Sequence, residues 1–142
     1  MSAPITSPSP PASRPAGTQP AQSSTLQRLR DIVGASHVLT AADDTAPFLT
    51  DWRRRFTGRA QAVVLPGSTS EVAASVHLCA EHRTPIVPQG GNTGMVGAAT
   101  PDTSGSAIVL SLRRMDRVRA VDAINGTITV EAGCILRNVQ QA

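Results

Sequence analysis

The apolar residues that follow residue 24 recur at helical spacing. They are Leu26, Leu29, Ile32 and Val33. Residues three or four apart lie on one face of a helix, so the pattern predicts an amphipathic helix over residues 25–33. Ser24 followed by Gln27 has the spacing of a capping box at the start of this helix, and Gly34 ends the pattern.

Residues 62–88 predict a strand, a helix and a second strand. The apolar run at residues 62–65 closes at a Pro-Gly turn, and residues 85–88 form another short strand-like run. Between them lies a helical pattern whose expected apolar face consists of Val72, Val76, Cys79 and Ala80. The whole segment is typical of a βαβ unit, whose two strands are expected to be parallel with a right-handed crossover.

The helix of this unit carries its own start signal. Ser68 and Glu71 form a second capping box, and the helical pattern ends near His82. Cys79 lies on the apolar face, so we expect a small core residue there rather than a nucleophile.

The remaining part of the chain predicts three more strands. Residues 107–112 indicate a third buried strand with a parallel partner. Residues 118–122 and 127–132 alternate in polarity on either side of Asn125-Gly126, which is typical of a hairpin turn.

The two ends of the chain differ from its middle. Residues 1–24 contain six of the 11 prolines and one branched aliphatic residue. They cannot bury enough apolar surface to offset the entropy of ordering, so we expect a disordered tail that is neither a secretory nor a transit peptide. A helix is expected to begin at Ile135 and to be cut short at Ala142. No apolar stretch is long enough to cross a membrane.

All 13 basic residues of this 142-residue chain are arginine, and the formal net charge is +3. The absence of lysine excludes a P-loop and a pyridoxal Schiff base. Three excess charges spread along the chain do not favour nucleic-acid binding. The run at residues 53–55 is expected to be a solvated loop. A second group of arginines could face an anionic ligand or shield an edge strand against aggregation, and we favour the second interpretation. This group consists of Arg113, Arg114, Arg117 and Arg119.

Aromatic, cysteine and histidine residues are few. The aromatic residues lie four apart and are expected to anchor a connecting segment: Phe48, Trp52 and Phe56. Cys79 and Cys134 are too few for a disulfide framework, and no Cys/His cluster has zinc spacing. We therefore expect no metal site and a reducing, cytoplasmic location.

A glycine-rich loop at Pro88–Gly97 is the main candidate site. Glycine lets a ligand approach the backbone, and successive N–H groups form a nest for phosphate oxygens, to which Asn92 and Thr93 add hydrogen bonds. A flexible surface turn explains four glycines in eight positions equally well. The loop follows the second strand of the βαβ unit, at the strand end where open sheets bind ligands, which favours anion binding. The order of the glycines, followed by Thr100-Pro101, disfavours a Rossmann fold.

Several separated motifs lie along the chain, at residues 51–53, 62–69, 88–97, 110–118 and 130–134. In sequence and in order they resemble one family, the FAD-linked oxidases of the vanillyl-alcohol oxidase and p-cresol methylhydroxylase superfamily. The resemblance is greatest to the group of D-2-hydroxyglutarate dehydrogenase and the glycolate oxidase D subunit. The resemblance implies an α+β fold, a partial FAD-binding domain in which a small βαβ-containing parallel sheet is followed by a β-hairpin. The expected organisation is a tail at 1–24, a helix and connecting segment at 25–57, and the truncated FAD-binding domain at 58–142.

The resemblance also implies the residues that approach FAD. They are Pro88, Gly90, Gly91, Asn92, Thr93, Gly94, Met95, Leu112, Met115, Ala132, Gly133 and Cys134. Two positions depart from the family pattern. Ala98 replaces a common glycine, and Asp116 replaces a common asparagine, which would place an extra carboxylate near an anionic cofactor if it faces inward.

The function implied by the resemblance is the FAD-binding part of an oxidoreductase. The whole enzyme would oxidise a D-2-hydroxyacid of the 2-hydroxyglutarate, lactate or glycolate type by hydride transfer to flavin. This chain would bind the cofactor without being catalytic, because the catalytic and substrate-binding residues would lie in a C-terminal part outside it. Two alternatives stay open: a stand-alone anion- or nucleotide-binding module without redox activity, and a chain that does nothing alone because one wall of the FAD cleft is missing.

Overall fold

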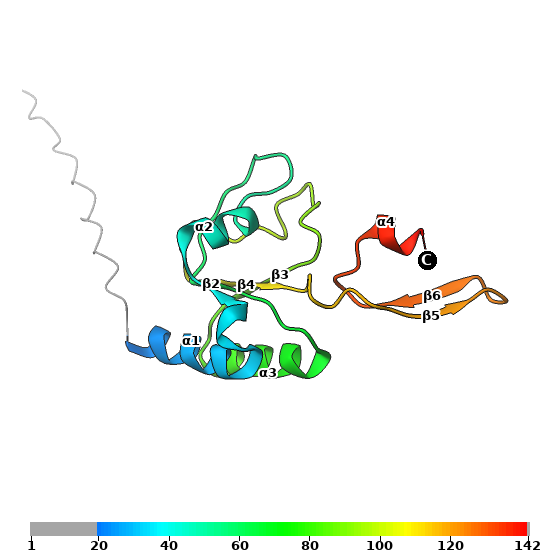
Figure 1. The fold of residues 1–142 in the computed structure, drawn as a ribbon. Coiled ribbons are helices and arrows are strands. Elements are labelled where there is room, and N and C mark those ends of the chain that lie inside the picture. The colour runs from blue at the N-terminus through cyan, green and yellow to red at the C-terminus, as the bar shows by residue number, and fades with distance from the viewer. Residues whose placement is uncertain (1–19, 142) are drawn as a thin grey trace, which may run out of the picture.

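The computed structural model describes residues 20–141 of the chain. The helices are α1 (Pro20–Val33), α2 (Ala42–Thr45), α3 (Thr69–Glu81) and α4 (Leu136–Val139), with short 3₁₀ turns at η1 (Ala35–His37) and η2 (Ala46–Phe48). The strands are β1 (Val38–Leu39), β2 (Ala62–Val64), β3 (Ile86–Gln89), β4 (Ile108–Ser111), β5 (Val118–Asp122) and β6 (Thr127–Val130). A mostly parallel sheet followed by a hairpin confirms the predicted α+β class (Figure 1).

The main sheet has the strand order β1-β2-β4-β3. Strand β4 is parallel to both neighbours, with Val109 opposite Val63 on one side and Ser111 opposite Gln89 on the other. The short strand β1 pairs antiparallel with the outer edge of β2. The predicted βαβ unit is therefore present, but β4 lies between its two strands.

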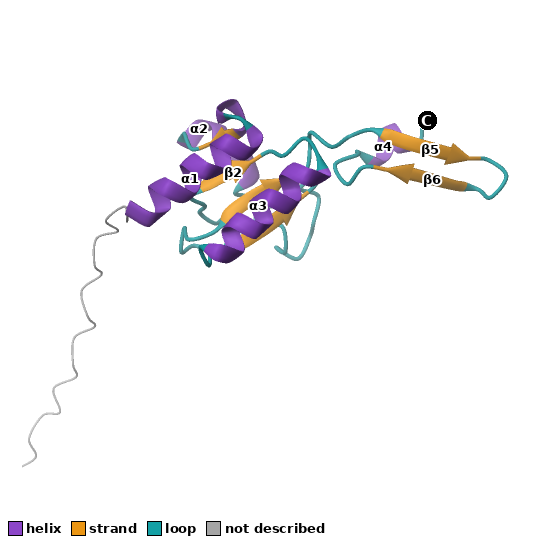
Figure 2. Cartoon of the chain, turned by 90° about the horizontal axis from the view of Figure 1, so that it is seen from below, coloured by secondary structure: helices purple, strands orange, loops and turns teal. Residues whose placement is uncertain are grey.

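The central strands are buried on both faces, and alternate residues enter two separate cores. Ala62, Val64, Ile108 and Leu110 pack with Leu29 of α1 and Leu78 of α3, which cover one side of the sheet (Figures 1 and 2). On the other side, Val63 and Val109 pack against Phe48 of η2. Because successive side chains of a strand point to opposite faces, a run of apolar residues is needed where both faces are covered.

Helix α1 begins earlier than predicted. It starts at Pro20, so the expected capping box at Ser24 and Gln27 lies inside a helix that has already begun. Residues 20–24 belong to this helix and not to a disordered tail, while residues 1–19 lie outside the described residues. A proline fits the first turn because the N–H group it lacks has no partner within the helix there.

Helix α3 has the predicted start but a rotated apolar face. The Ser68 hydroxyl accepts a hydrogen bond from the Glu71 N–H at 3.2 Å, which confirms the capping position. Cys79 is buried as predicted, and its burial raises the pKa of the thiol. Val76 and Ala80 instead face solvent, while Ser75 and Leu78 are buried. The apolar pattern alone misplaced this face because the chain buries a serine on it.

The connecting segment before β2 is anchored by one aromatic residue, not three. Phe48 is 4% exposed, whereas Trp52 is 68% and Phe56 is 47% exposed. The Asp51 carboxylate organises the rest of this loop by accepting hydrogen bonds from the backbone N–H groups of Phe56, Arg55 and Arg53. These bonds, that from Phe56 above all, lower the pKa of Asp51.

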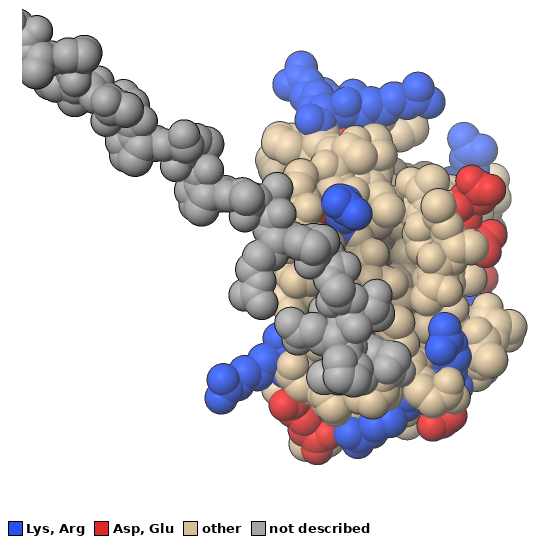
Figure 3. Space-filling view, turned by 90° about the vertical axis from the view of Figure 1, so that its left-hand side faces the viewer, with Lys and Arg blue, Asp and Glu red and all other residues tan. Residues whose placement is uncertain are grey.

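The arginines at residues 53–55 are exposed, as expected for a solvated loop. Seen from the side of the molecule, basic side chains line the upper edge, while acidic and basic side chains are interspersed lower down (Figure 3).

The β5–β6 hairpin extends away from the main sheet (Figures 1 and 2). The predicted turn is confirmed, and Gly126 has a φ of +62°, which glycine adopts without strain. Most residues of both strands are exposed, including Val121 and Ile128. The hairpin therefore contributes little to the two cores.

Candidate functional site

A cleft of about 310 Å³ opens at the carboxyl ends of β3 and β4. The glycine loop forms one wall through Gly90, Gly91 and Asn92. Gly133, in the turn after β6, forms a second wall, which adjoins the loop: a Cβ atom added at Gly90 would lie 3.6 Å from the Ala132 carbonyl oxygen. Ligands of open parallel sheets bind at this end of the strands, so the cleft lies where the topology predicts a site.

The backbone of the glycine loop is free to bind a ligand. Within the described part of the chain, no hydrogen bond uses the N–H groups of Gly90, Gly91, Asn92, Thr93 or Gly94. A Cβ atom added at Gly91 would come no closer than 4.0 Å to another residue, and one added at Gly94 would meet nothing within 4 Å. Packing within the described chain therefore does not require glycine at these two positions.

The loop is attached to the segment that precedes β2 by two side-chain amides. Asn92, with a φ of +53°, donates from Nδ2 to the Thr50 carbonyl at 2.9 Å. Gln89 is 2% exposed and donates from Nε2 to the carbonyls of Phe48 and Ala99, both at 2.9 Å. A buried amide that binds two carbonyls from distant segments fixes both in place.

The second wall depends on a close backbone contact at Gly133. A Cβ atom there would lie 1.9 Å from the Leu112 carbonyl oxygen, which is closer than any real contact. The Gly133 N–H donates to the Met115 carbonyl at 2.8 Å, and the Met115 N–H donates to the Leu112 carbonyl at 2.9 Å. Glycine is thus required at this position by packing alone.

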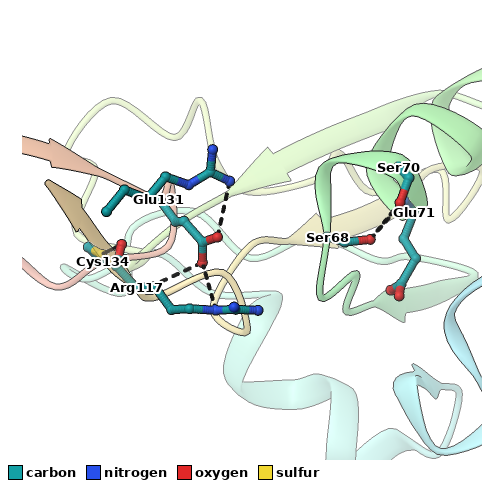
Figure 4. A network of polar contacts seen from close by, with 7 residues as sticks. Ser68, Ser70, Glu71, Arg117, Glu131 and Cys134 are labelled. Carbon is teal, nitrogen blue, oxygen red and sulfur yellow. Dashed lines mark hydrogen bonds and ion pairs between the residues drawn. The ribbon is translucent and has the colours of Figure 1, made fainter.

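An ion-pair network holds this wall in place. Glu131 lies between Arg117 and Arg119, and it accepts hydrogen bonds from the Arg117 backbone N–H and from the Arg119 guanidinium, both at 3.1 Å (Figure 4). The backbone bond and the two cations lower the pKa of Glu131 despite the opposing effect of burial. Cys134 adds a 3.5 Å contact from its thiol to the Arg117 carbonyl.

The four arginines expected to shield an edge strand make different contacts. Arg117 and Arg119 pair with Glu131, and Arg114 donates to the Leu65 carbonyl at 2.7 Å. Arg113 lies over the Phe48 ring, 4.1 Å from its centroid, and lines the cleft. Arg113 and Arg114 thus contact segments far from the β5–β6 hairpin, whereas Arg117 and Arg119 pair across this hairpin and stay 78% and 54% exposed, so the edge shield stays a prediction for those two.

The cleft contains both signs of charge. Asp116 lines it together with Arg113, so the residue at this departure from the family pattern belongs to the site. The backbone N–H groups of the glycine loop add partial positive charge. An anionic ligand would therefore be held by amides and by one arginine, with one carboxylate opposing it.

Twelve residues were expected to approach a cofactor, and four of them line the cleft: Gly90, Gly91, Asn92 and Gly133. Thr93, Gly94 and the 54% exposed Met95 continue the exposed part of the loop, and Pro88 is an exposed residue of β3. Leu112 and the buried Met115 contact the Gly133 turn through their carbonyls, while Ala132 and Cys134 flank Gly133. The cofactor contacts of all twelve stay predictions.

Several lining residues were missed: Pro47, Phe48, Gln89, Ser111, Arg113, Ile135 and Asn138. Gln89 and Ser111 carried a usable signal, because each is a polar residue that ends an otherwise apolar strand. Arg113 also carried one, because its group of arginines could face an anionic ligand. The other four carried none, since their position depends on how distant segments pack.

Within residues 20–141, no three His, Cys, Asp or Glu residues are grouped closely enough to hold a metal ion. None of the helices in this part of the chain combines the length and the hydropathy that crossing a membrane requires.

Comparison with known proteins gives a consistent result. A family profile described as "FAD binding domain" matches residues 60–142. The chain is 38% identical over 110 residues to a probable mitochondrial D-2-hydroxyglutarate dehydrogenase of Oryza sativa subsp. indica, covering 78% of this chain and 19% of that protein. It is 36% identical over 118 residues to a D-2-hydroxyglutarate–pyruvate transhydrogenase of Saccharomyces cerevisiae, covering 82% of this chain and 23% of that protein. The chain thus spans about a fifth of the length of these curated relatives.

Solved structures share the fold. Substrate-bound p-cresol methylhydroxylase superposes with a TM-score of 0.73 at 25% identity, covering 89% of this chain and 26% of that one. An alkyldihydroxyacetonephosphate synthase superposes with a TM-score of 0.74 at 20% identity, covering 84% of this chain and 24% of that one.

Proposed function

Because the chain belongs to the FAD-binding domain family, as the match over residues 60–142 establishes, we propose that its cleft holds the diphosphate of FAD. The resemblance stated from the motifs, and the fold it implied, are confirmed by the family match and by the structural neighbours. The observation that carries the proposal is the set of free N–H groups between Gly90 and Gly94, beside glycines whose Cβ positions are open.

The residues present fit the cofactor. Five successive backbone N–H groups offer the donors that two phosphates need, and the open space at Gly91 lets phosphate oxygens approach the backbone. Arg113 supplies a cation in the same cleft. Bound FAD would supply a hydride acceptor, and the part played by this chain is to hold and orient the cofactor.

The remaining predicted contacts belong to the same proposal. Pro88, Thr93, Gly94 and Met95 would extend the loop wall, and Leu112, Met115, Ala132 and Cys134 would support the wall at Gly133. This assignment is supported by Asn92, which lies in the same loop, and by Gly133, which lies between Ala132 and Cys134, because both line the cleft.

For the whole protein we propose a flavin-dependent dehydrogenase that oxidises a D-2-hydroxyacid. The support is the names of the relatives, which are D-2-hydroxyglutarate dehydrogenases and a D-2-hydroxyglutarate–pyruvate transhydrogenase. This chain corresponds to about a fifth of their length, so we assign it cofactor binding and no catalytic residue.

The test is the affinity of the purified chain for FAD, measured by quenching of flavin fluorescence. We expect saturable binding, and we expect Gly91→Val to raise the Kd at least about tenfold, the effect of losing one hydrogen bond to a charged group. Gly126→Asn is the control, because asparagine tolerates the positive φ of this hairpin turn, which lies outside the cleft. Equal Kd values for Gly91→Val and the wild type would overturn the loop assignment.

The same experiment distinguishes the other interpretations. A chain that binds ADP or inorganic phosphate but never FAD would be an anion-binding module without redox activity. A chain that melts cooperatively and binds none of these would need a further segment to complete its cleft.

The location of the protein is a smaller part of the proposal. Cys79 and Cys134 are both free thiols, which suits a reducing compartment such as the cytoplasm. Several relatives are named as mitochondrial, so fractionation of cells that express the tagged protein is the deciding measurement.

A further inference from the structure

Two buried hydroxyl groups have no hydrogen-bond partner in the described part of the chain. They belong to Ser75 of α3, which is 0% exposed, and Ser111 of β4, which is 1% exposed. A buried hydroxyl without a partner destabilises a fold, so each such group requires an explanation. The two serines differ in position, because Ser111 lines the cleft and Ser75 does not.

The placement of Ser111 follows from the alternation along β4. Ile108 and Leu110 enter the core beneath the helices, and Val109 enters the core around Phe48. Ser111 therefore lies on the same face of the strand as Val109, which is the face that borders the cleft. A serine thus occupies the last position of a strand whose other three residues are all large and apolar.

The register of the sheet places Ser111 beside the residue that precedes the free amides. Ser111 is the parallel partner of Gln89, and Gly90 and Gly91 follow Gln89 directly. Gln89 already donates to two carbonyls and so holds the loop in position, but it does not bind Ser111. An acceptor held by the amides of Gly90 and Gly91 would lie over the end of β4.

We infer that Ser111 is a further binding residue of this cleft and that its hydroxyl donates a hydrogen bond to a diphosphate oxygen. The inference rests on the proposed function. It explains why the buried Ser111 hydroxyl has no hydrogen-bond partner within the described part of the chain. It also gives the cleft a side-chain donor on its floor, in addition to the backbone donors of the loop and the cation of Arg113.

The test compares Ser111→Ala with Ser75→Ala in the full chain. Each variant removes one buried, unpartnered hydroxyl, so neither should lower the melting temperature of the protein without ligand. We expect Ser111→Ala to raise the Kd for both FAD and ADP roughly tenfold, because the two ligands share the diphosphate. Ser75→Ala should leave both Kd values unchanged.

Each outcome is decisive. Unchanged binding by Ser111→Ala, with FAD still bound by the wild type, would overturn the inference and leave the proposed function intact. Weaker binding of FAD but not of ADP would also overturn it, because the hydroxyl would then contact the flavin half. Weaker binding by both serine variants would indicate a general effect on the core and would equally contradict a specific contact. A wild-type chain that binds neither ligand would overturn the assignment of FAD binding to this chain alone, and this inference with it.

Discussion

The two walls of the cleft use glycine for opposite reasons. At Gly133 a Cβ atom would collide with the Leu112 carbonyl at 1.9 Å, so the fold itself excludes a side chain. At Gly91 and Gly94 the Cβ positions are open, and the neighbouring N–H groups bind nothing in the described part of the chain. One wall is thus fixed by packing, whereas the other is held by Gln89 and Asn92 and keeps its backbone available for a ligand.

Gly133→Ala should have the largest effect on stability. The new methyl group meets backbone atoms, which cannot rotate away, so the turn or the segment at Leu112 must move. We expect the free energy of unfolding to fall by about 3 kcal/mol, as in severe overpacking, measured by urea denaturation. Gly94→Ala is the matched control and should stay within about 0.5 kcal/mol. Equal loss in both variants would show that the two walls do not differ.

Gln89→Leu should come next, because it removes the support of the loop wall. The carbonyls of Phe48 and Ala99 would lose their donor in a buried site, at a cost of about 2 kcal/mol. Urea denaturation measures this loss, and resistance of the loop to proteolysis should fall with it. A variant as stable as the wild type would mean that Gln89 does not position the loop.

A smaller, pH-dependent effect is expected from Glu131 on the packed wall. Its pKa is lowered from an ordinary value of 4.5 in the folded protein, mainly by the Arg117 N–H. The resulting stability is fully present above that value and is lost as the pH falls through the lower folded pKa. Between pH 7 and pH 3, Glu131→Gln should therefore lose less stability than the wild type. Parallel losses in the two proteins would contradict this assignment.

Gly91→Ala should change stability least, by less than about 0.5 kcal/mol, because the nearest atom beyond its chain neighbours to the added methyl group, Thr93 Cγ2, lies 4.0 Å away at an ordinary contact distance. The same variant should weaken FAD binding. Its affinity for FAD should therefore fall while its stability is kept, whereas Gly133→Ala should lower the stability itself. Thermal melting with and without FAD gives both values. A marked loss of stability without ligand would show that packing requires glycine at position 91, as it does at Gly133.

Much of the fold could be predicted from local pattern. The buried strands, the Ser68 cap and the hairpin at Gly126 follow from signals within a few residues, because hydrophobic alternation, capping and turn geometry are local. The rotated face of α3 and the single aromatic anchor could not be predicted. Ser75 and Phe48 are buried only because of the elements that pack on them.

By itself, the sequence determined the FAD-binding family and predicted the loop that lines the cleft, because these depend on residue types in a short, ordered pattern. Only the tertiary structure decided that β4 lies between β2 and β3. That insertion places Ser111 beside Gln89 and brings Arg113 and Gly133 to the same cleft. The physical reason is that a hydrogen-bonded register joins residues 22 positions apart and a close backbone contact joins residues 21 positions apart, and no local pattern records which distant backbone they meet.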